Sequence, residues 1–147
     1  MTGVLIIAHA PLAHAFRQCA LHVFPDLGHA LASVDVQPNA SPEETLAAAR
    51  IALSELGTRE TLVLTDVFGA TPSNVAQRLV DGVNTRLVTG LNLPMLLRAV
   101  TYRSESLDSL IARVLSGGTQ GIMSVAITAP QVQARRHHDQ DRYDHQQ

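Results

Sequence analysis

Short apolar runs alternate with segments of helical periodicity along most of the chain. Val4–Ala8 is a continuous, β-branched-rich run, as expected of a strand buried on both faces. Apolar side chains then recur at helical spacing from Leu12 to Val23, after Pro11, which suits a first helical turn. Leu31–Val36 predicts a second strand. This alternation is typical of βα units.

The second helix has the best-marked ends. Ser41 suits an N-cap, Glu44 completes a capping box, and Gly57 predicts the stop. The remaining pattern predicts further elements in a fixed order. These are a strand Thr61–Thr65, a helix from Thr71-Pro72 to about Val80, a strand Arg86–Thr89, a helix over roughly Met95–Tyr102, a helix capped by Ser106 and ended by Gly117-Gly118, and a fifth strand Ile122–Thr128.

Four βα units followed by a late strand predict an α/β fold with an open, doubly wound sheet and helices on both faces. We expect the parallel strands to follow the order 2-1-3-4. The fifth strand follows a Gly-rich break, so it is expected to pair antiparallel at an edge or with a second subunit. The predicted domain covers residues 1–129, and the polar composition of residues 130–147 indicates a disordered or loosely ordered tail.

Composition narrows the function classes. Only 3% of the 147 residues are aromatic and the formal net charge is −2, which favours neither a stacking platform nor a basic surface for nucleic acid. All 11 basic residues are Arg, so chemistry that needs a lysine is excluded. The lone Cys19 fits a reducing compartment and is expected to pack in the core. With no apolar run of roughly 18 residues and no signal-peptide pattern, we expect a cytoplasmic protein.

The candidate chemistry lies where two predicted strands end. His9 follows the first strand and Asp66 follows the third, and in the expected strand order both stand at the crevice of the sheet. Asp66 could accept a hydrogen bond from one ring nitrogen of His9 and leave the other free to attack. Gly69, Ala70 and Thr71 lead into a helix N-terminus, so their N–H groups and the Thr71 hydroxyl are suited to hold phosphoryl oxygens. No metal and no cofactor is needed.

Simpler roles exist for the same residues. Thr71, Pro72 and Asn74 could serve only as a helix start, and Asp66 could be a turn former. The histidines on or just after the first helix are expected to be solvated, and those in the tail have a spacing that fits no standard set of metal ligands. They are His14, His22, His29, His137, His138 and His145. No nucleotide-binding fingerprint follows any strand.

The residues Ile7–Ala10, Thr65–Asn74 and Gly90–Leu96 resemble the mannose-family enzyme IIA domain of the bacterial phosphoenolpyruvate-dependent sugar phosphotransferase system. The resemblance runs from about Val4 to Thr128. It implies that His9 accepts a phosphoryl group from the phosphocarrier HPr and passes it to a IIB domain or subunit. It further implies that the residue at Asp66 orients the imidazole, that the residue at Thr71 lies beside the phosphoryl group, and that two subunits exchange their last strands.

The chain departs mildly from the family at three positions: Ala10 stands where Gly is common, Phe68 where Trp is frequent, and Thr71 where Ser is frequent. Two other functions stay open at this point. One is a regulatory phosphoprotein whose state at His9 is read by a target protein. The other is the phosphotransferase subunit of a dihydroxyacetone kinase system, which resembles this chain less in the loop after Asp66.

Overall fold

The computed structural model describes residues 1–127. The predicted tail, residues 130–147, lies outside the described residues. The elements are β1 (Gly3–His9), α1 (Leu12–Val23), the 3-10 helix η1 (Pro25–Ala30), β2 (Leu31–Val36), α2 (Pro42–Leu56), β3 (Thr61–Thr65), α3 (Thr71–Leu79), β4 (Thr85–Thr89), α4 (Leu93–Thr101) and α5 (Leu107–Gln120).

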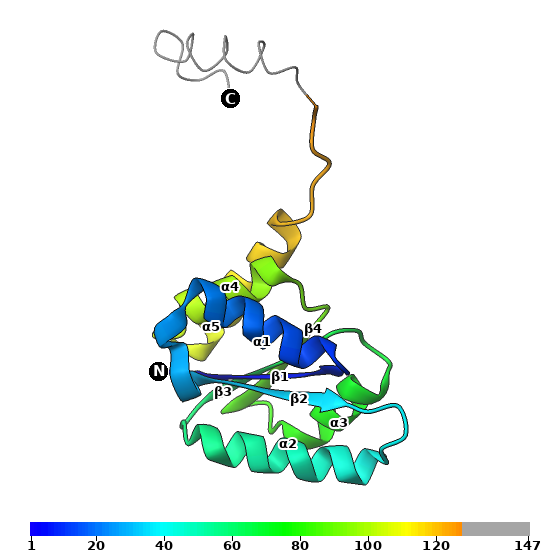
Figure 1. Ribbon diagram of the computed structural model, residues 1–147. Helices are drawn as coiled ribbons and strands as arrows, with labels where there is room; N and C mark the ends of the chain where they lie inside the picture. The colour runs from blue at the N-terminus through cyan, green and yellow to red at the C-terminus, as the bar shows by residue number, and fades with distance from the viewer. Residues whose placement is uncertain (128–147) are drawn as a thin grey trace, which may run out of the picture.

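The four strands form one parallel sheet in the order β2-β1-β3-β4, which confirms the predicted order. Parallel pairing aligns the strands so that β1 and β3, the two central ones, end side by side: Ile7 lies opposite Thr65. Figure 1 shows all strands running in one direction, with helices above and below the sheet. The register therefore brings His9 and Asp66 to the same edge.

Two apolar clusters cover the two faces of the sheet. On one face Val4, Ile6 and Ala8 of β1 pack with α1, α4 and α5, and on the other Leu5 and Ile7 pack with α2 and α3. The first six residues of β1 are all buried. Because side chains alternate along a strand, His9 shares the α2–α3 face with Leu5 and Ile7.

The predicted ends of α2 are confirmed. The Ser41 hydroxyl accepts a hydrogen bond from the Glu44 backbone N–H at 3.1 Å, and the Glu44 carboxylate accepts one from the Ser41 N–H at 3.1 Å. Gly57 ends the helix in the left-handed conformation, with φ +62°.

Replacement of Ser41 by alanine is expected to lower the free energy of unfolding by about 1 kcal/mol, because the first turn loses its side-chain acceptor. Chemical denaturation monitored by circular dichroism measures this. Ser41→Asn is the matched control, since asparagine also caps helices well and should retain most of the stability. Equal losses for both variants would contradict a capping role.

The glycine pair in α5 corrects one prediction. The helix does not end at Gly117-Gly118 but continues through it to Gln120. A Cβ at Gly117 would lie 2.5 Å from Arg98 Cγ, and one at Gly118 would lie 2.6 Å from Met95 Cγ. The two glycines therefore allow α5 to approach α4 closely rather than terminating the helix.

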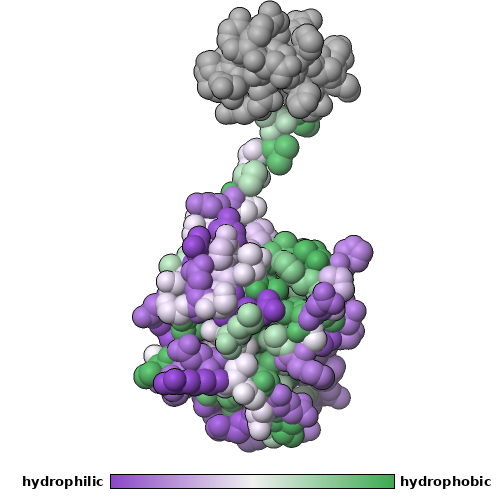
Figure 2. All heavy atoms as spheres, turned by 90° about the vertical axis from the view of Figure 1, so that its left-hand side faces the viewer, coloured by the Kyte–Doolittle hydropathy of each residue, from purple (hydrophilic) through white to green (hydrophobic). Residues whose placement is uncertain are grey.

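The last described segment also differs from expectation. Residues 122–127 form no strand and do not pair with the sheet of the single chain, while Thr128 lies outside the described residues. Four apolar side chains of the segment are exposed: Ile122, Met123, Val125 and Ile127. Figure 2 shows the segment as a narrow stalk with apolar residues that leaves the folded body. Within residues 1–127, the predicted fifth strand is therefore not formed.

Cys19 is exposed, so its predicted core position is wrong. The buried side of α1 runs through Ala13 and Ala20, with Phe16 partly buried against the same cluster. Cys19 precedes Ala20 by one position, a rotation of about 100° around the helix. None of the helices within residues 1–127 is both long and apolar enough to cross a bilayer.

Candidate phosphoryl-acceptor site

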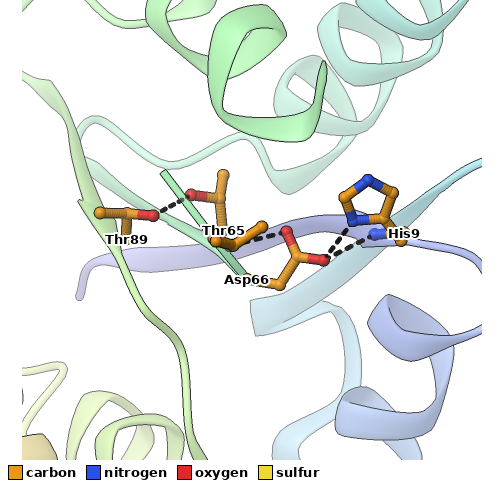
Figure 3. Close-up of polar contacts among 5 residues, drawn as sticks. His9, Thr65, Asp66 and Thr89 are labelled. Atoms are coloured by element: carbon orange, nitrogen blue, oxygen red, sulfur yellow. Dashed lines mark hydrogen bonds and ion pairs between the residues drawn. The ribbon is translucent and has the colours of Figure 1, made fainter. Parts of the chain in front are cut away.

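His9 and Asp66 are in direct contact. The imidazole Nδ1 lies 2.7 Å from Asp66 Oδ2, and the same carboxylate oxygen accepts the His9 backbone N–H at 3.1 Å (Figure 3). The His9 side chain is 51% exposed, whereas that of Asp66 is 11% exposed. A largely buried carboxylate thus holds one nitrogen of an accessible ring.

The contact defines which ring nitrogen is available. With an ionised Asp66 as acceptor, Nδ1 carries the proton, so Nε2 holds the free lone pair. In Figure 3 this second nitrogen lies on the side of the ring away from the carboxylate. The arrangement suits a nucleophilic imidazole whose developing positive charge the carboxylate would stabilise.

Asp66 is itself anchored at both oxygens. Oδ1 accepts the Val67 backbone N–H at 2.9 Å, while Oδ2 accepts the two bonds from His9. Partial burial is the largest single influence and raises the pKa of the Asp66 carboxyl. The hydrogen bonds from the His9 ring, the His9 backbone and the Val67 backbone, together with the charge attraction of the His9 ring, outweigh it, and the pKa of Asp66 lies below its ordinary value of 3.8.

This shift gives a pH prediction. Because the pKa of Asp66 is lower in the folded chain than in the unfolded chain, the ionised carboxylate stabilises the fold above pH 3.8. That stability is lost as the pH falls through the folded-state pKa. In an NMR titration, the Asp66 carboxyl carbon should change with a midpoint below 3.8. A midpoint at or above that value would contradict the anchoring described here.

The loop after Asp66 leads to the N-terminus of α3. Gly69 has φ +87°, a conformation that favours glycine, and Ala70 is the N-cap residue without a side-chain hydrogen bond to the helix. Thr71 is the first residue of α3. No hydrogen bond joins Thr71 to His9 or Asp66 within the described part of the chain. The structure therefore brings His9 and Asp66 together, and it places Thr71 at the start of α3, five residues after Asp66.

One supporting residue was not anticipated. The Asp35 carboxylate, on β2, accepts the His14 backbone N–H at 3.2 Å in the first turn of α1. Since α1 begins three residues after His9, this bond fixes the segment that leaves the site. A lone aspartate within an apolar strand was the available signal. The side chains of His14, His22 and His29 are exposed, as expected.

These observations define a class of protein. It is a doubly wound α/β domain of flavodoxin-like topology, with a strand-end histidine oriented by an aspartate at the crevice between the central strands.

Comparison with known proteins identifies the family. Residues 3–115 match the EIIA-man family model, described as the PTS system fructose IIA component. The chain belongs to this mannose-type EIIA family of the phosphotransferase system, whose components are phosphotransferases.

Two relatives are informative. The mannose-specific EIIAB component of Escherichia coli K12 is 29% identical over 96 residues, which are 63% of this chain and 30% of that protein. The chain thus spans about a third of the curated relative. The sorbose-specific EIIA component of Lacticaseibacillus casei is 26% identical over 114 residues, covering 76% of this chain and 82% of its own.

Solved structures agree with the fold. The mannose/sorbose-specific IIA subunit of Enterococcus faecalis superimposes with a TM-score of 0.78 at 26% identity, covering 87% of this chain and 97% of that one. The EIIA component of Streptococcus agalactiae gives a TM-score of 0.75 at 26% identity, covering 84% and 97%.

Proposed function

We propose that this chain is a phosphocarrier of the sugar phosphotransferase system, which accepts a phosphoryl group from phospho-HPr on His9 Nε2 and passes it to a IIB domain or subunit. The observation that carries the proposal is the 2.7 Å contact between His9 Nδ1 and the largely buried Asp66 carboxylate, on a ring that is half exposed. The working unit comprises residues 1–129 and acts in the cytoplasm.

The transfer step needs only the residues of this site and the donor. The lone pair of His9 Nε2 attacks the phosphorus of the donor's phosphohistidine, so a P–N bond forms here as the donor's P–N bond breaks. The donor ring keeps the electron pair of the broken bond. The His9 proton stays on Nδ1, hydrogen-bonded to Asp66, throughout the step.

The phosphoryl oxygens would be held by the segment Gly69, Ala70 and Thr71. The start of α3 carries backbone N–H groups without a side-chain cap, and a helix N-terminus attracts negative charge. We assign the Thr71 hydroxyl as a further donor to a phosphoryl oxygen. Among the described residues, neither His9 nor Asp66 forms a hydrogen bond with this hydroxyl.

A labelling experiment tests the function. The chain is incubated with phosphoenolpyruvate, enzyme I and HPr, and the product is mapped by mass spectrometry under alkaline conditions. One acid-labile phosphoryl group on His9 is expected, and it should be lost when a IIB protein is added. No labelling, or labelling at another residue, would overturn the proposal. Transfer to the ADP-bearing subunit of a dihydroxyacetone kinase, but to no IIB protein, would support that alternative.

We further propose a homodimer in which the last strands are exchanged. The exposed apolar segment 122–127 needs a surface to cover it, and the outer edge of β4 offers one. The Thr85 carbonyl accepts hydrogen bonds from the N–H groups of Asp81 and Gly82, so it points away from β3. Because backbone groups alternate in direction along a strand, those of Leu87 and Thr89 also point to the outer edge of β4. A groove of about 250 Å³ adjoins this edge beside α4 and α5.

Truncation tests the exchange. A chain ending at Gly121 is expected to be monomeric in analytical ultracentrifugation, because it lacks the strand that would pair with the partner. The matched control ends at Ala129 and should remain dimeric, since it retains that strand. A monomeric full-length chain would refute the dimer, and a dimeric chain ending at Gly121 would refute the exchange.

A further inference from the structure

Two threonines are paired next to the site, on the side of Asp66 away from His9 (Figure 3). Thr65 is the last residue of β3, Thr89 is the last residue of β4, and the two are direct partners in the parallel register. The Thr65 hydroxyl donates a hydrogen bond to the Thr89 hydroxyl at 3.1 Å (Figure 3). Thr65 is completely buried.

A hydroxyl in this position has a cost. Thr65 follows the apolar residues Leu62–Leu64 at the end of β3, where valine would have nearly the same shape and is likewise favoured in strands. A buried hydroxyl is unfavourable unless it is hydrogen-bonded. The backbone adds a second link, because the Thr65 carbonyl accepts the Leu91 N–H at 3.0 Å. Thr65 is therefore tied through both side chain and backbone to the end of β4 and the loop beyond it.

Asp66 follows Thr65 directly, so its backbone begins where β3 ends. Among the described residues, His9 and Val67 donate the three hydrogen bonds of its carboxylate, and none of these bonds reaches β4. We propose that the hydroxyl pair of Thr65 and Thr89 is a positioning pair, which fixes the end of β3 so that the Asp66 carboxylate meets His9 Nδ1. This inference rests on the proposed function in one respect: it takes His9 as the residue that accepts the phosphoryl group.

Position matters here because the contact is short and directional. On its other side Thr65 lies opposite Ile7, two residues before His9, so the end of β3 lies between the strand that bears the nucleophile and β4. Without the hydroxyl pair, the last residue of β3 keeps only its backbone bonds, at the point where the strand passes into a loop. A shift of a few tenths of an ångström would weaken the bond between Asp66 and Nδ1.

The test uses Thr65→Val, which keeps the shape and removes the donor. Thr61→Val is the matched control: Thr61 is the first residue of β3, is 2% exposed, and its hydroxyl lies 3.1 Å from that of Thr58. Both variants lose one hydroxyl pair from the same strand, so both are expected to lose similar stability.

Only Thr65→Val should alter the active ring. In ¹⁵N NMR spectra of the imidazole, His9 should change from one predominant Nδ1–H tautomer to a mixture, and the rate of phosphorylation should fall about tenfold, since misplacement by 1 Å can cost a hundredfold. Thr61→Val should keep the parent spectrum and rate. Identical spectra and rates for Thr65→Val and the parent would overturn the proposal.

The double variant Thr65→Val, Thr89→Val separates positioning from packing. Replacing both partners by apolar groups of the same shape should restore much of the stability, while the mixed tautomer should persist. Full recovery of the tautomer would overturn the proposal, because packing alone would then place Asp66. If no donor phosphorylates the parent chain, the proposed function fails, but the ring spectra still decide the positioning role.

Discussion

Replacement of His9 by alanine is expected to abolish phosphorylation completely. The variant lacks Nε2, the only nucleophile that the site presents, and no other described group stands in its place beside Asp66. The measurement is incorporation of acid-labile phosphate from phosphoenolpyruvate in the presence of enzyme I and HPr. Incorporation should fall to the background given by heat-denatured chain.

His14→Ala is the matched control for this prediction. His14 is also exposed and lies five residues further on, but only its backbone N–H makes a hydrogen bond near the site. The control should therefore be labelled at the parent rate. Circular dichroism should show the same fold for both variants, since His9 is half exposed and contributes little to the core. Undiminished labelling of His9→Ala would end the case for this histidine.

The regular elements were largely predictable because local signals agreed with tertiary packing. The boundaries of β2, α2 and β3 are as the pattern indicated. In α2 the capping box and the C-terminal glycine each satisfy backbone groups that the helix itself leaves unpaired. The local sequence therefore indicates where this helix begins and ends. In β1 a continuous apolar run is typical of a strand buried on both faces, and its first six residues are buried.

The incorrect predictions concern residues whose position depends on packing against a distant segment of the chain. Judged from the neighbouring residues alone, a glycine pair near the end of a helix predicts that the helix stops there. Gly117 and Gly118 instead allow close contact with α4, and the periodicity of α5 does not reveal this contact. The sequence pattern places Cys19 on an apolar stripe, but α1 meets the sheet through small alanines on an adjacent side.

The site was predictable to the extent that topology determines it. Once the order 2-1-3-4 is given, the histidine that ends β1 and the aspartate that follows β3 must lie at neighbouring strand ends. The anchoring of the carboxylate was not predictable. The bond from the Val67 N–H and the pairing of Thr65 with Thr89 depend on loop conformation and register, which a single sequence does not specify.

Asp66→Asn is expected to slow phosphorylation by roughly 10²- to 10⁴-fold, as when an amide replaces the aspartate that orients a catalytic histidine. The carboxylate accepts hydrogen bonds at both oxygens, so the amide NH₂ must face either the Val67 N–H or His9. If the NH₂ group faces His9, it meets a second donor, the His9 backbone N–H. It can then form a hydrogen bond with the ring only if Nδ1 is the acceptor. The ring proton then moves to Nε2, which can no longer attack.

If the introduced amide turns its NH₂ towards Val67 instead, the correct tautomer persists, but the negative charge that stabilises the developing imidazolium is lost. Both orientations therefore predict a slower reaction, and ¹⁵N spectra of the ring tell which one is present. Asp26→Asn, at an exposed position remote from the site, should be phosphorylated at the parent rate. A parent-like rate for Asp66→Asn would show that neither the charge nor the orientation supplied by Asp66 contributes to the transfer, and the site would then reduce to an unassisted surface histidine.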